Sequence, residues 1–372
     1  MMKILWLTNI PSPYRVDFFN ELGKYCRLTV LFERRASAER DASWEKFNIE
    51  NFKAIFLKGK NIGVAEAFCP SVKKYLKKGE YDHIVVTNFS NLTGMCAIRY
   101  MKKKHIPYEI ESDGAFAGTG KGIKEKLKKY FLSGAERYFS TADEHDKYYL
   151  TYGAEKEKVV RYPFSSICEC DIVDTVISHE KKHQLKQELG IKEKFSIISV
   201  GRFSYLNGYG KGYDVLLKAA TQLSPDVGWY VIGGAPTLEF IKMREELRLT
   251  NVHFIDFLDK KQLLKYYRSA DVFTLMTIGE AWGLVINEAM AQGLPIISTD
   301  RCIAALEMIQ DGKNGYVIPV GDVDTLVEKI KIVLQDEELV QDMGACALIK
   351  IREYTIEEMA KRHMEIFTGC KN

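Results

Sequence analysis

Two glutamates that lie eight positions apart are the residues of this chain whose type and spacing are best suited to chemistry. Residues 280 to 288 read Glu-Ala-Trp-Gly-Leu-Val-Ile-Asn-Glu, and the segment before them, Asp271 to Met276, is typical of a buried strand. A helix-forming run follows and ends at a glycine and a proline. We therefore predict that Glu280 lies on a strand-to-helix loop and Glu288 on the helix. A spacing of slightly over two helical turns can place both acids on one face.

The beginning of that helix is suited to a phosphate group. Its first backbone N–H groups have no partner within the helix, and the helix dipole places partial positive charge beside them. Carboxylates instead accept hydrogen bonds from hydroxyl groups, such as those of a sugar. A ligand with both groups, such as a sugar nucleotide, explains acids on either side of a phosphate site. The alternative is structural, with one glutamate on the surface and one on an exposed helix face.

A second strand-to-helix loop carries two basic residues. Arg202 follows the predicted strand Ser196–Val200 after one glycine, and Lys211 comes nine positions later, before the next predicted helix. Arg can grip a diphosphate with two parallel hydrogen bonds, and Lys can neutralise it as a point charge. Gly233 and Gly234 end the next strand, where the lack of side chains lets a ligand approach the backbone. A solvated basic loop and a plain turn are the alternatives.

The two common nucleotide-binding fingerprints are absent from this region. Its glycines do not fit the pattern G-x-G-x-x-G, and the chain contains no G-K-[ST] of a P-loop. A dehydrogenase is therefore disfavoured.

Two strand ends in the first half carry candidate residues for a second substrate. Tyr14 and Arg15 follow a loop that two prolines stiffen, and strand ends of an α/β sheet face the ligand-binding edge. They can contact an acceptor or a phosphate. Asp113, in the sequence Glu-Ser-Asp-Gly, can orient or deprotonate an acceptor hydroxyl. The structural alternatives are a place in the first helical turn for Arg15 and a helix cap or Asx-turn for Asp113.

The elements that must position these residues form two series of alternating strands and helices, which predicts two parallel sheets. In the first series we expect strands at Lys3–Thr8, Leu28–Phe32, Ile84–Thr87, Pro107–Glu111 and Arg137–Ser140, and helices at Tyr14–Lys24, Asn91–Lys103, Lys121–Leu132 and Ala142–Tyr152. In the second series we expect strands at Ser196–Val200, Trp229–Ile232, Val252–Ile255, Val272–Leu275, Ile296–Thr299 and Tyr316–Ile318, and helices at Tyr213–Gln222, Leu238–Arg248, Lys260–Arg268 and Val285–Gln292, with two to three more from Val323 onward.

Between the two series lies a polar stretch, Ser165 to Lys194, with one expected helix at Lys181–Leu189. The predicted fold class is α/β, with two Rossmann-like domains that face each other across a cleft at the carboxyl ends of their strands. We place the domains at residues 1–165 and 166–352, and we expect residues 353–372 to return to the first domain as a helix.

Composition suits a two-domain globular protein, since the 372 residues are 46% hydrophobic and 28% charged. No apolar run approaches the roughly 20 residues of a membrane helix, and the first residues lack the features of a signal peptide. The eight cysteines are scattered without C-x-x-C or zinc-type spacing, which indicates reduced thiols in a cytosol. Asp322-Val-Asp324, the only D-x-D, is expected to cap a helix and not to bind a metal.

The net charge of +3 is unevenly distributed, because residues 1–165 hold 29 Lys and Arg against 20 Asp and Glu. This excess favours an anionic partner for the first half. The segment Lys121 to Phe131 is basic and amphipathic, and four of its apolar residues, Ile123, Leu127, Tyr130 and Phe131, share one stripe. Such a helix can lie on an anionic membrane surface, although a solvated helix face is the alternative. No nucleic-acid recognition motif accompanies the basic clusters, so we expect no nucleic-acid partner.

The second half resembles the retaining glycosyltransferases of family four, which have the GT-B fold. The segments that carry the resemblance are, in chain order, Gly201-Arg202, Lys211 to Asp214, Val231 to Gly234, Tyr266 to Val272, Glu280 to Gly283, Glu288 to Pro295, Glu307 and Asp311 to Gly315. The resemblance implies that Glu280 holds the hydroxyls of the donor sugar near its anomeric carbon and that Glu288 binds the ribose. It further implies that the departing diphosphate is neutralised, without a metal or cofactor, by side chains and backbone N–H groups of Arg202, Lys211, Gly283, Leu284 and Val285.

Several positions depart from the family pattern. Met276-Thr277 replaces a common Pro-Ser, Trp282 replaces the usual Phe, and Ser112-Asp113 stands where the family often has His-Asp. The Pro-Ser-Pro-Tyr-Arg loop replaces the glycine-rich loop after the first strand, and some bacterial surface-polysaccharide enzymes of the family are similar there.

The resemblance therefore implies a transferase that moves a hexose or N-acetylhexosamine from a nucleoside-diphosphate sugar, UDP before GDP. The implied acceptor is a glycan or a polyprenyl-diphosphate-linked oligosaccharide, and the implied place is the cytoplasmic face of the cell membrane. A GT-B sugar-nucleotide epimerase, which turns over without an acceptor, and a non-catalytic nucleotide-sugar-binding protein remain the alternatives.

Overall fold

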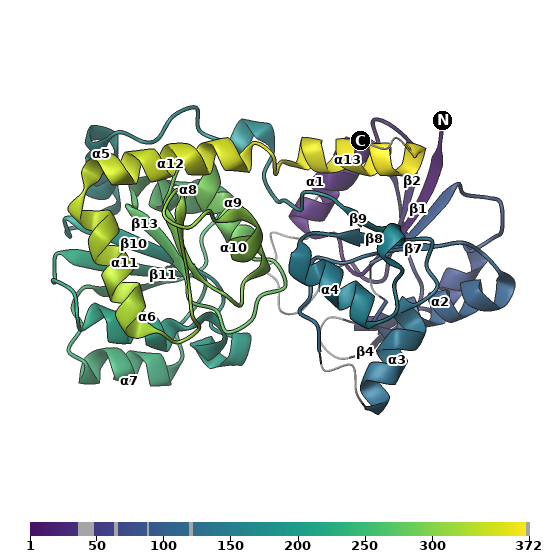
Figure 1. Ribbon diagram of the computed structural model, residues 1–372, viewed down its shortest axis with the longest axis horizontal. Helices are drawn as coiled ribbons and strands as arrows, with labels where there is room; N and C mark the ends of the chain where they lie inside the picture. Colours follow the sequence, from purple (N-terminus) through teal and green to yellow (C-terminus); the bar gives the residue numbers. More distant parts are fainter. Residues whose placement is uncertain (36–47, 63–65, 88, 119–121, 370–372) are drawn as a thin grey trace. The chain divides into compact units, whose positions relative to one another are not determined.

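The computed structural model describes residues 1–35, 48–62, 66–87, 89–118 and 122–369, and it divides into two compact units (Figure 1). Unit 1 contains Met1–Ser166 together with Tyr354–Asn372, and unit 2 contains Ile167–Glu353. Each unit is built on a sheet of parallel strands, so the predicted α/β class is confirmed. None of the helices in the described part of the chain combines the length and apolar composition that crossing a membrane requires.

The main sheet of unit 1 has seven strands in the order β3-β2-β1-β6-β7-β8-β9, and all neighbours are parallel. These strands are β1 (Lys3–Thr8), β2 (Arg27–Phe32), β3 (Lys53–Phe56), β6 (His83–Val86), β7 (Glu109–Glu111), β8 (Arg137–Ser140) and β9 (Val159–Arg161), beside a small antiparallel pair, β4 (Lys60–Ile62) and β5 (Glu66–Phe68). The helices are α1 (Pro13–Leu22), α2 (Leu92–Lys104), α3 (Ile123–Leu132), α4 (Asp143–Thr151) and α13 (Ile356–Thr368), with 3-10 turns η2 (Pro70–Lys74) and η3 (Lys156–Lys158).

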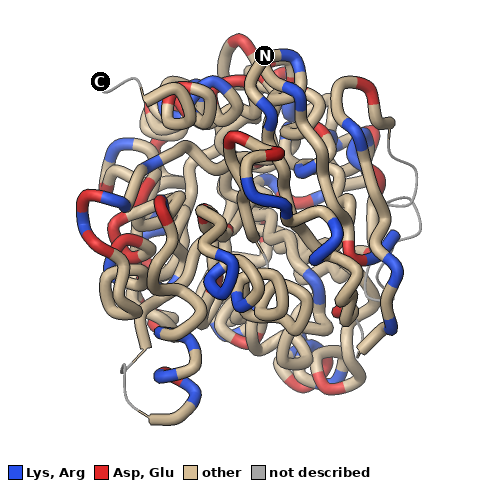
Figure 2. The backbone as a smooth tube through the Cα atoms, turned by 90° about the vertical axis from the view of Figure 1, so that its right-hand side faces the viewer, with Lys and Arg blue, Asp and Glu red and all other residues tan. Residues whose placement is uncertain are grey.

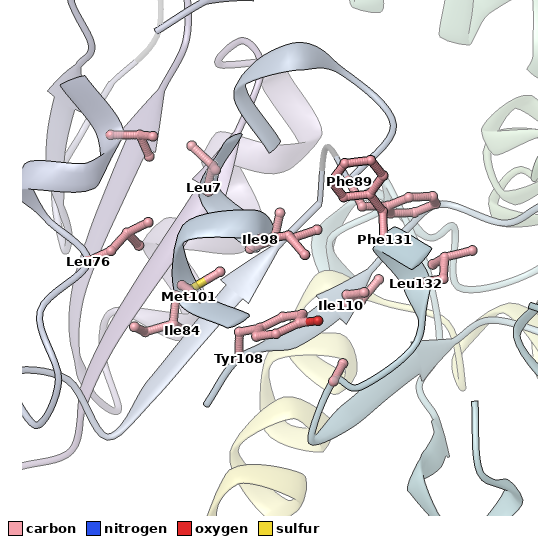
Figure 3. Packing of buried hydrophobic residues seen from close by; sticks show 14 of the residues in the cluster. Leu7, Leu76, Ile84, Phe89, Ile98, Met101, Tyr108, Ile110, Phe131 and Leu132 are labelled. Carbon is pink, nitrogen blue, oxygen red and sulfur yellow. The ribbon is translucent and has the colours of Figure 1, made fainter. Parts of the chain in front are cut away.

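One core of unit 1 lies between the sheet and α2. Side chains of Ile98 and Met101 on α2 pack against Leu7, Ile84 and Ile110 of the central strands, and all of them are buried (Figure 3). The side chain of Asn91 caps α2 by accepting a hydrogen bond from the amide of Gly94 at 2.7 Å. The apolar positions of the central strands are buried on both faces, as expected for a parallel sheet with helices on either side.

The last helix, α13, belongs to unit 1 and packs against α1 (Figure 1). His363 of α13 is fully buried, and its ring stacks on Phe139 at 4.8 Å between ring centroids. The rings of Trp6 and Phe18 lie 5.6 and 4.9 Å from the same imidazole. The aromatic rings of the first and last parts of the chain therefore form one continuous packing layer.

The sheet of unit 2 has six parallel strands in the order β12-β11-β10-β13-β14-β15. They are β10 (Phe195–Val200), β11 (Val227–Ile232), β12 (Val252–Ile255), β13 (Val272–Leu275), β14 (Ile296–Thr299) and β15 (Gly315–Ile318). The helices are α5 (His179–Leu189), α6 (Tyr213–Ala220), α7 (Leu238–Glu246), α8 (Lys260–Ser269), α9 (Leu284–Ala291), α10 (Ile303–Met308), α11 (Val323–Gln335) and α12 (Glu337–Ile351), with 3-10 turns η4 (Glu169–Asp171) and η5 (Tyr205–Lys211).

Among the described residues, the prediction missed four short strands and one short α-helix, which are β3, β4, β5, β9 and α10. None is longer than six residues, so none holds enough turns or alternating positions to produce a clear periodic pattern. The helix expected from Lys121 begins at Ile123 in the structure, and Lys121 itself lies outside the described residues.

Candidate functional site

The loop between β13 and α9 places Glu280 beside the beginning of a helix. The Glu280 amide donates a hydrogen bond to the carbonyl of Arg301 at 2.8 Å, which fixes the loop against the segment after β14. Gly283 precedes α9 with φ 111°, and a Cβ atom there would lie 2.7 Å from the Cys302 sulfur. Only glycine fits this backbone conformation and this space. Leu284 and Val285 form the first helical positions, so their amides have no acceptor within the helix.

The side chains of Lys211 and Glu280 form an ion pair, although they are 69 positions apart in the sequence. The side chain of Lys211 is 14% exposed and that of Glu280 is 25% exposed, so a ligand can still reach both. The Lys211 nitrogen also lies 5.6 Å from the ring centroid of Tyr205, which adds a cation–π contact.

Close backbone packing brings these two loops together. Gly212 has φ 69°, and a Cβ atom there would lie 1.9 Å from the carbonyl oxygen of Met276 at the end of β13. Any larger residue would separate the loop after β10 from the loop after β13. The approach of Lys211 to Glu280 therefore depends on a glycine.

Arg202 and Gly233 lie at the ends of β10 and β11, on adjacent turns. Gly233 has φ 139°, and a Cβ atom there would meet the carbonyl oxygen of Gly201 at 2.4 Å. Gly201 also packs against the Lys211 side chain, since the carbons of that side chain would lie 3.2 Å from a Cβ atom at Gly201. Arg202, the next residue, is exposed. The structure thus brings Arg202, Gly233 and Lys211 to one edge of the unit 2 sheet.

Glu288 lies on α9 in a largely enclosed position and accepts a hydrogen bond from the hydroxyl of Tyr267 at 2.9 Å. Burial raises the pKa of Glu288 to about 7, although the Tyr267 hydroxyl and the Lys260 charge lower it. Asp171, which accepts from Lys260, adds a smaller upward contribution to that pKa. Glu288 is therefore a carboxyl group whose charge changes near neutral pH.

In unit 1, the predicted residues Tyr14, Arg15 and Asp113 meet at the ends of β1 and β7. The Arg15 guanidinium lies 2.5 Å from an Asp113 carboxylate oxygen and 2.5 Å from a Glu111 carboxylate oxygen. The Tyr14 hydroxyl donates to the other oxygen of Asp113 at 3.1 Å. The Arg15 side chain is only 4% exposed, whereas that of Asp113 is 41% exposed. Arg15 thus serves two carboxylates of its own chain, and Asp113 is the accessible member of the group.

The pKa values of this cluster follow from its charges. Burial alone would raise the pKa of Glu111, but the Arg15 guanidinium and the His363 ring outweigh it and lower the pKa to about 2. Burial and the Asp113 charge raise the pKa of Tyr14 to about 12, so its hydroxyl stays a hydrogen-bond donor at neutral pH. The cluster therefore holds a charged Glu111 at its centre.

Sequence reasoning missed the polar residues that surround Asp113. Ser112 contacts His145 at 2.8 Å and Tyr149 at 3.1 Å, and the Tyr162 hydroxyl donates to Glu111 at 3.1 Å. His145 and Tyr149 lie on α4, and Tyr162 follows β9. Because they come from elements far from Ser112 in the sequence, no local pattern could have identified them.

The described residues contain no group of three or more His, Cys, Asp and Glu side chains arranged to hold a metal ion. The D-x-D sequence has the capping role that was predicted for it. The Asp322 carboxylate accepts a hydrogen bond from the amide of Thr325 at 3.0 Å, at the beginning of α11.

Comparison with known proteins shows what this chain is similar to. The family model for glycosyl transferases group 1 matches residues 181–348, which include the whole unit 2 site. An uncharacterized glycosyltransferase of Haemophilus influenzae is 26% identical over 297 residues, which cover 77% of this chain and 76% of that protein. The N,N'-diacetylbacillosaminyl-diphospho-undecaprenol alpha-1,3-N-acetylgalactosaminyltransferase of Campylobacter jejuni is 22% identical over 306 residues, which cover 79% and 78% of the two chains.

Solved structures share the complete fold. The crystal structure of Anabaena HepE in complex with UDP and glucose superposes with a TM-score of 0.78 at 17% identity, covering 99% of this chain and 100% of that chain. Both α/β units are included in this match. A fold with two Rossmann-like units of this kind is called GT-B. The chain is a glycosyltransferase with the GT-B fold, and its residues 181–348 match the family model for glycosyl transferases group 1.

Proposed function

We propose that this protein is a retaining, metal-independent transferase that moves a hexose or N-acetylhexosamine from a nucleoside-diphosphate sugar, UDP rather than GDP. The acceptor in this proposal is a glycan or a polyprenyl-diphosphate-linked oligosaccharide. The observation that carries the proposal is the meeting of the Lys211 ammonium, the Glu280 carboxylate and the first amides of α9 at one point of unit 2. The ammonium and the amides can bind a diphosphate, and the carboxylate can accept hydrogen bonds from sugar hydroxyls.

Donor binding then consists of an exchange of ion-pair partners. The diphosphate takes the Lys211 ammonium from Glu280 and accepts hydrogen bonds from the amides of Leu284 and Val285. The released Glu280 carboxylate accepts hydrogen bonds from hydroxyls of the sugar. Arg202, at the adjacent strand end, supplies a second cation to the departing diphosphate. Fixed cations and amides of this kind stabilise the charge that develops on a leaving group, so the proposal requires no metal or cofactor.

Glu288 has the role of ribose ligand in this proposal. Its carboxylate lies on α9 beyond the phosphate-binding end, and the Tyr267 hydroxyl already holds one of its oxygens. The remaining lone pairs can accept hydrogen bonds from the two ribose hydroxyls. A charged carboxylate accepts such bonds more strongly than a neutral carboxyl group.

The acceptor side is assigned to unit 1, with Asp113 as the group that orients or deprotonates the attacking hydroxyl. Tyr14 and Arg15 hold the Asp113 carboxylate in place. The names of similar proteins support these substrate classes. The HepE crystals contain UDP and glucose, and the C. jejuni relative is named for transfer to a diphospho-undecaprenol-linked sugar.

The surface of α3 supports a peripheral place on the cytoplasmic face of the cell membrane. Three residues of the predicted apolar stripe are exposed, since Ile123 is 87% exposed, Leu127 48% and Tyr130 47%, whereas the fourth, Phe131, is buried in the core of unit 1. Four exposed lysines lie around the stripe, namely Lys124, Lys126, Lys128 and Lys129. Figure 2 shows further Lys and Arg residues of unit 1 in blue. Exposed apolar residues ringed by lysines are typical of helices that lie in an anionic lipid interface.

Calorimetric titration of the purified chain with UDP, GDP, ADP, CMP and NAD, each with and without EDTA, tests the donor assignment. We expect UDP to bind tightly and the chelator to have no effect. Lys211→Ala is expected to weaken UDP binding strongly. Lys218→Ala, which removes an exposed ion pair with Asp214 in the same unit, serves as the matched control. Binding of NAD alone, or no binding of any nucleotide, would overturn the proposal.

A further inference from the structure

The turn after β7 holds a chain of hydrogen bonds whose direction can be worked out. His145 is fully buried on α4, and the backbone N–H of Thr141 points to its Nδ1 atom at 3.2 Å. Because that N–H can only donate, Nδ1 must carry the lone pair and Nε2 must carry the ring proton. Burial lowers the pKa of His145 to about 3, which keeps the ring neutral at physiological pH. The Nε2–H group therefore donates to the Ser112 hydroxyl oxygen at 2.8 Å.

The other end of the chain is fixed in the same way. The Tyr149 hydroxyl donates to the carbonyl oxygen of Phe139 at 3.1 Å, so its own oxygen is left to accept. Ser112 lies 3.1 Å from that oxygen and donates its proton to it. The Ser112 oxygen thus receives one hydrogen bond, gives its only proton away and keeps one lone pair. Ser112 is half-buried and lies next to Asp113 in the chain.

The side chain of the neighbouring Asp113 also accepts hydrogen bonds and donates none. Its carboxylate accepts from the Arg15 guanidinium and from the Tyr14 hydroxyl, and its side chain is 41% exposed. A carboxylate has about four lone-pair positions, so positions remain for a ligand. The two adjacent side chains of this turn offer acceptors and no donors.

We propose that Ser112 and Asp113 form a hydrogen-bond-accepting edge that binds a hydroxyl of the terminal sugar of the acceptor, and that His145 is the positioning residue that sets the direction of the Ser112 hydroxyl. The inference rests on the proposed transferase function and deepens it. Two side chains that only accept hydrogen bonds cannot hydrogen-bond a phosphodiester, which itself has only acceptors. The sugar end of a lipid-linked acceptor meets this edge, and its diphosphate does not.

Saturation-transfer NMR on the full-length chain tests the inference with a panel of methyl glycosides of glucose, galactose, mannose, N-acetylglucosamine and N-acetylgalactosamine. Dimethyl phosphate serves as the donor-free probe. We expect at least one glycoside to bind, and we expect the dimethyl phosphate signal to be the same in wild type and Ser112→Ala. Ser112→Ala removes one hydrogen bond and is expected to weaken glycoside affinity about fivefold. Lys218→Ala, at an exposed position of unit 2, should leave that affinity unchanged, whereas a loss in Glu280→Ala and not in Ser112→Ala would assign the glycoside to the donor-sugar site and overturn the inference.

Two variants of His145 distinguish positioning from simple support of the fold. His145→Gln keeps an N–H donor that can reach the Ser112 oxygen, and it is expected to retain glycoside binding. His145→Leu removes the donor and is expected to lose as much affinity as Ser112→Ala, whereas Ser112→Thr, which keeps the hydroxyl, retains it. UDP binding to unit 2 stays the same in all four variants, so failure of the donor assignment is recognised separately. Equal glycoside binding by wild type, Ser112→Ala and His145→Leu overturns the inference, as does dimethyl phosphate binding that Ser112→Ala weakens or the absence of any glycoside binding.

Discussion

The raised pKa of Glu288 leads to a prediction that links stability to pH. Its folded-state pKa is about 7, against an ordinary value of 4.5, because burial disfavours the charged form. Between these two values the folded protein holds a proton that the unfolded chain releases. The free energy of unfolding contributed by this group is therefore highest below pH 4.5 and falls as pH rises through 7.

The size of the effect follows from the shift. Each pKa unit corresponds to about 1.4 kcal/mol, so the full shift corresponds to about 3 kcal/mol. Because the side chain retains some exposure, we expect about 2 kcal/mol in practice. Glu288→Gln keeps the shape and a hydrogen-bond acceptor for Tyr267 but cannot ionise. Relative to wild type, the variant should gain about 2 kcal/mol in its free energy of unfolding between pH 5 and pH 8.

The assay is urea unfolding of the full chain at pH 5 and pH 8, followed by hydrogen-exchange labelling of peptides from β13 and β14. These peptides report the unfolding of unit 2 separately from that of unit 1, which matters because multi-domain chains seldom unfold in one step. Glu328→Gln, at an exposed position of α11, is the matched control. A stability difference between Glu288→Gln and wild type that is the same at both pH values would refute the reasoning.

Three further predictions address the donor site, the unit 1 cluster and the membrane surface. Glu280→Ala should reduce turnover about a hundredfold or more while changing UDP affinity little, measured by sugar transfer and calorimetry; unchanged turnover would remove Glu280 from the site. Arg15→Met removes the cation beside the buried Glu111, and should lower the free energy of unfolding of unit 1 by about 3 kcal/mol or more in urea. An unchanged free energy of unfolding would show that the ion pairs of Arg15 do not stabilise unit 1. Replacing the four α3 lysines by Ser should weaken sedimentation with anionic vesicles by about 1 kcal/mol per lysine, and retained binding would reject α3 as the anchor.

Local patterns predicted most of the alternating elements, and the strands and the helix that were missed, β3, β4, β5, β9 and α10, are short. The loop before α9 was predicted from a buried strand, a glycine and an apolar helical run, all of them adjacent in sequence. The same reasoning placed Lys211 at a strand end and Glu280 at another. It could not show that they form an ion pair, because that contact depends on Gly212 packing against the backbone at Met276.

The contacts within the unit 1 cluster could not be predicted from the sequence, for a related reason. Arg15 was predicted to contact an acceptor or a phosphate. In the structure its guanidinium forms ion pairs with Glu111 and Asp113. The partners His145 and His363 come from α4 and α13, and each was unremarkable in its own helical pattern. Burial of a charge is decided by tertiary packing, and only the complete fold brings the compensating groups together.

The return of α13 to unit 1 also determines the order in which the two units can finish folding. Unit 2 is one continuous stretch, whereas unit 1 has the whole of Ile167–Glu353 inserted between its two pieces. During synthesis, the ring of His363 reaches Trp6 and Phe139 only after all of unit 2 has emerged. Until then, the aromatic layer that α13 covers is exposed, and Glu111 lacks its contact with the ring of His363. Contacts of such large sequence separation form slowly. The nascent first unit is therefore the part of this protein most dependent on protection from aggregation, and truncation before Ile356 should affect unit 1, at the opposite end of the sequence, more than unit 2.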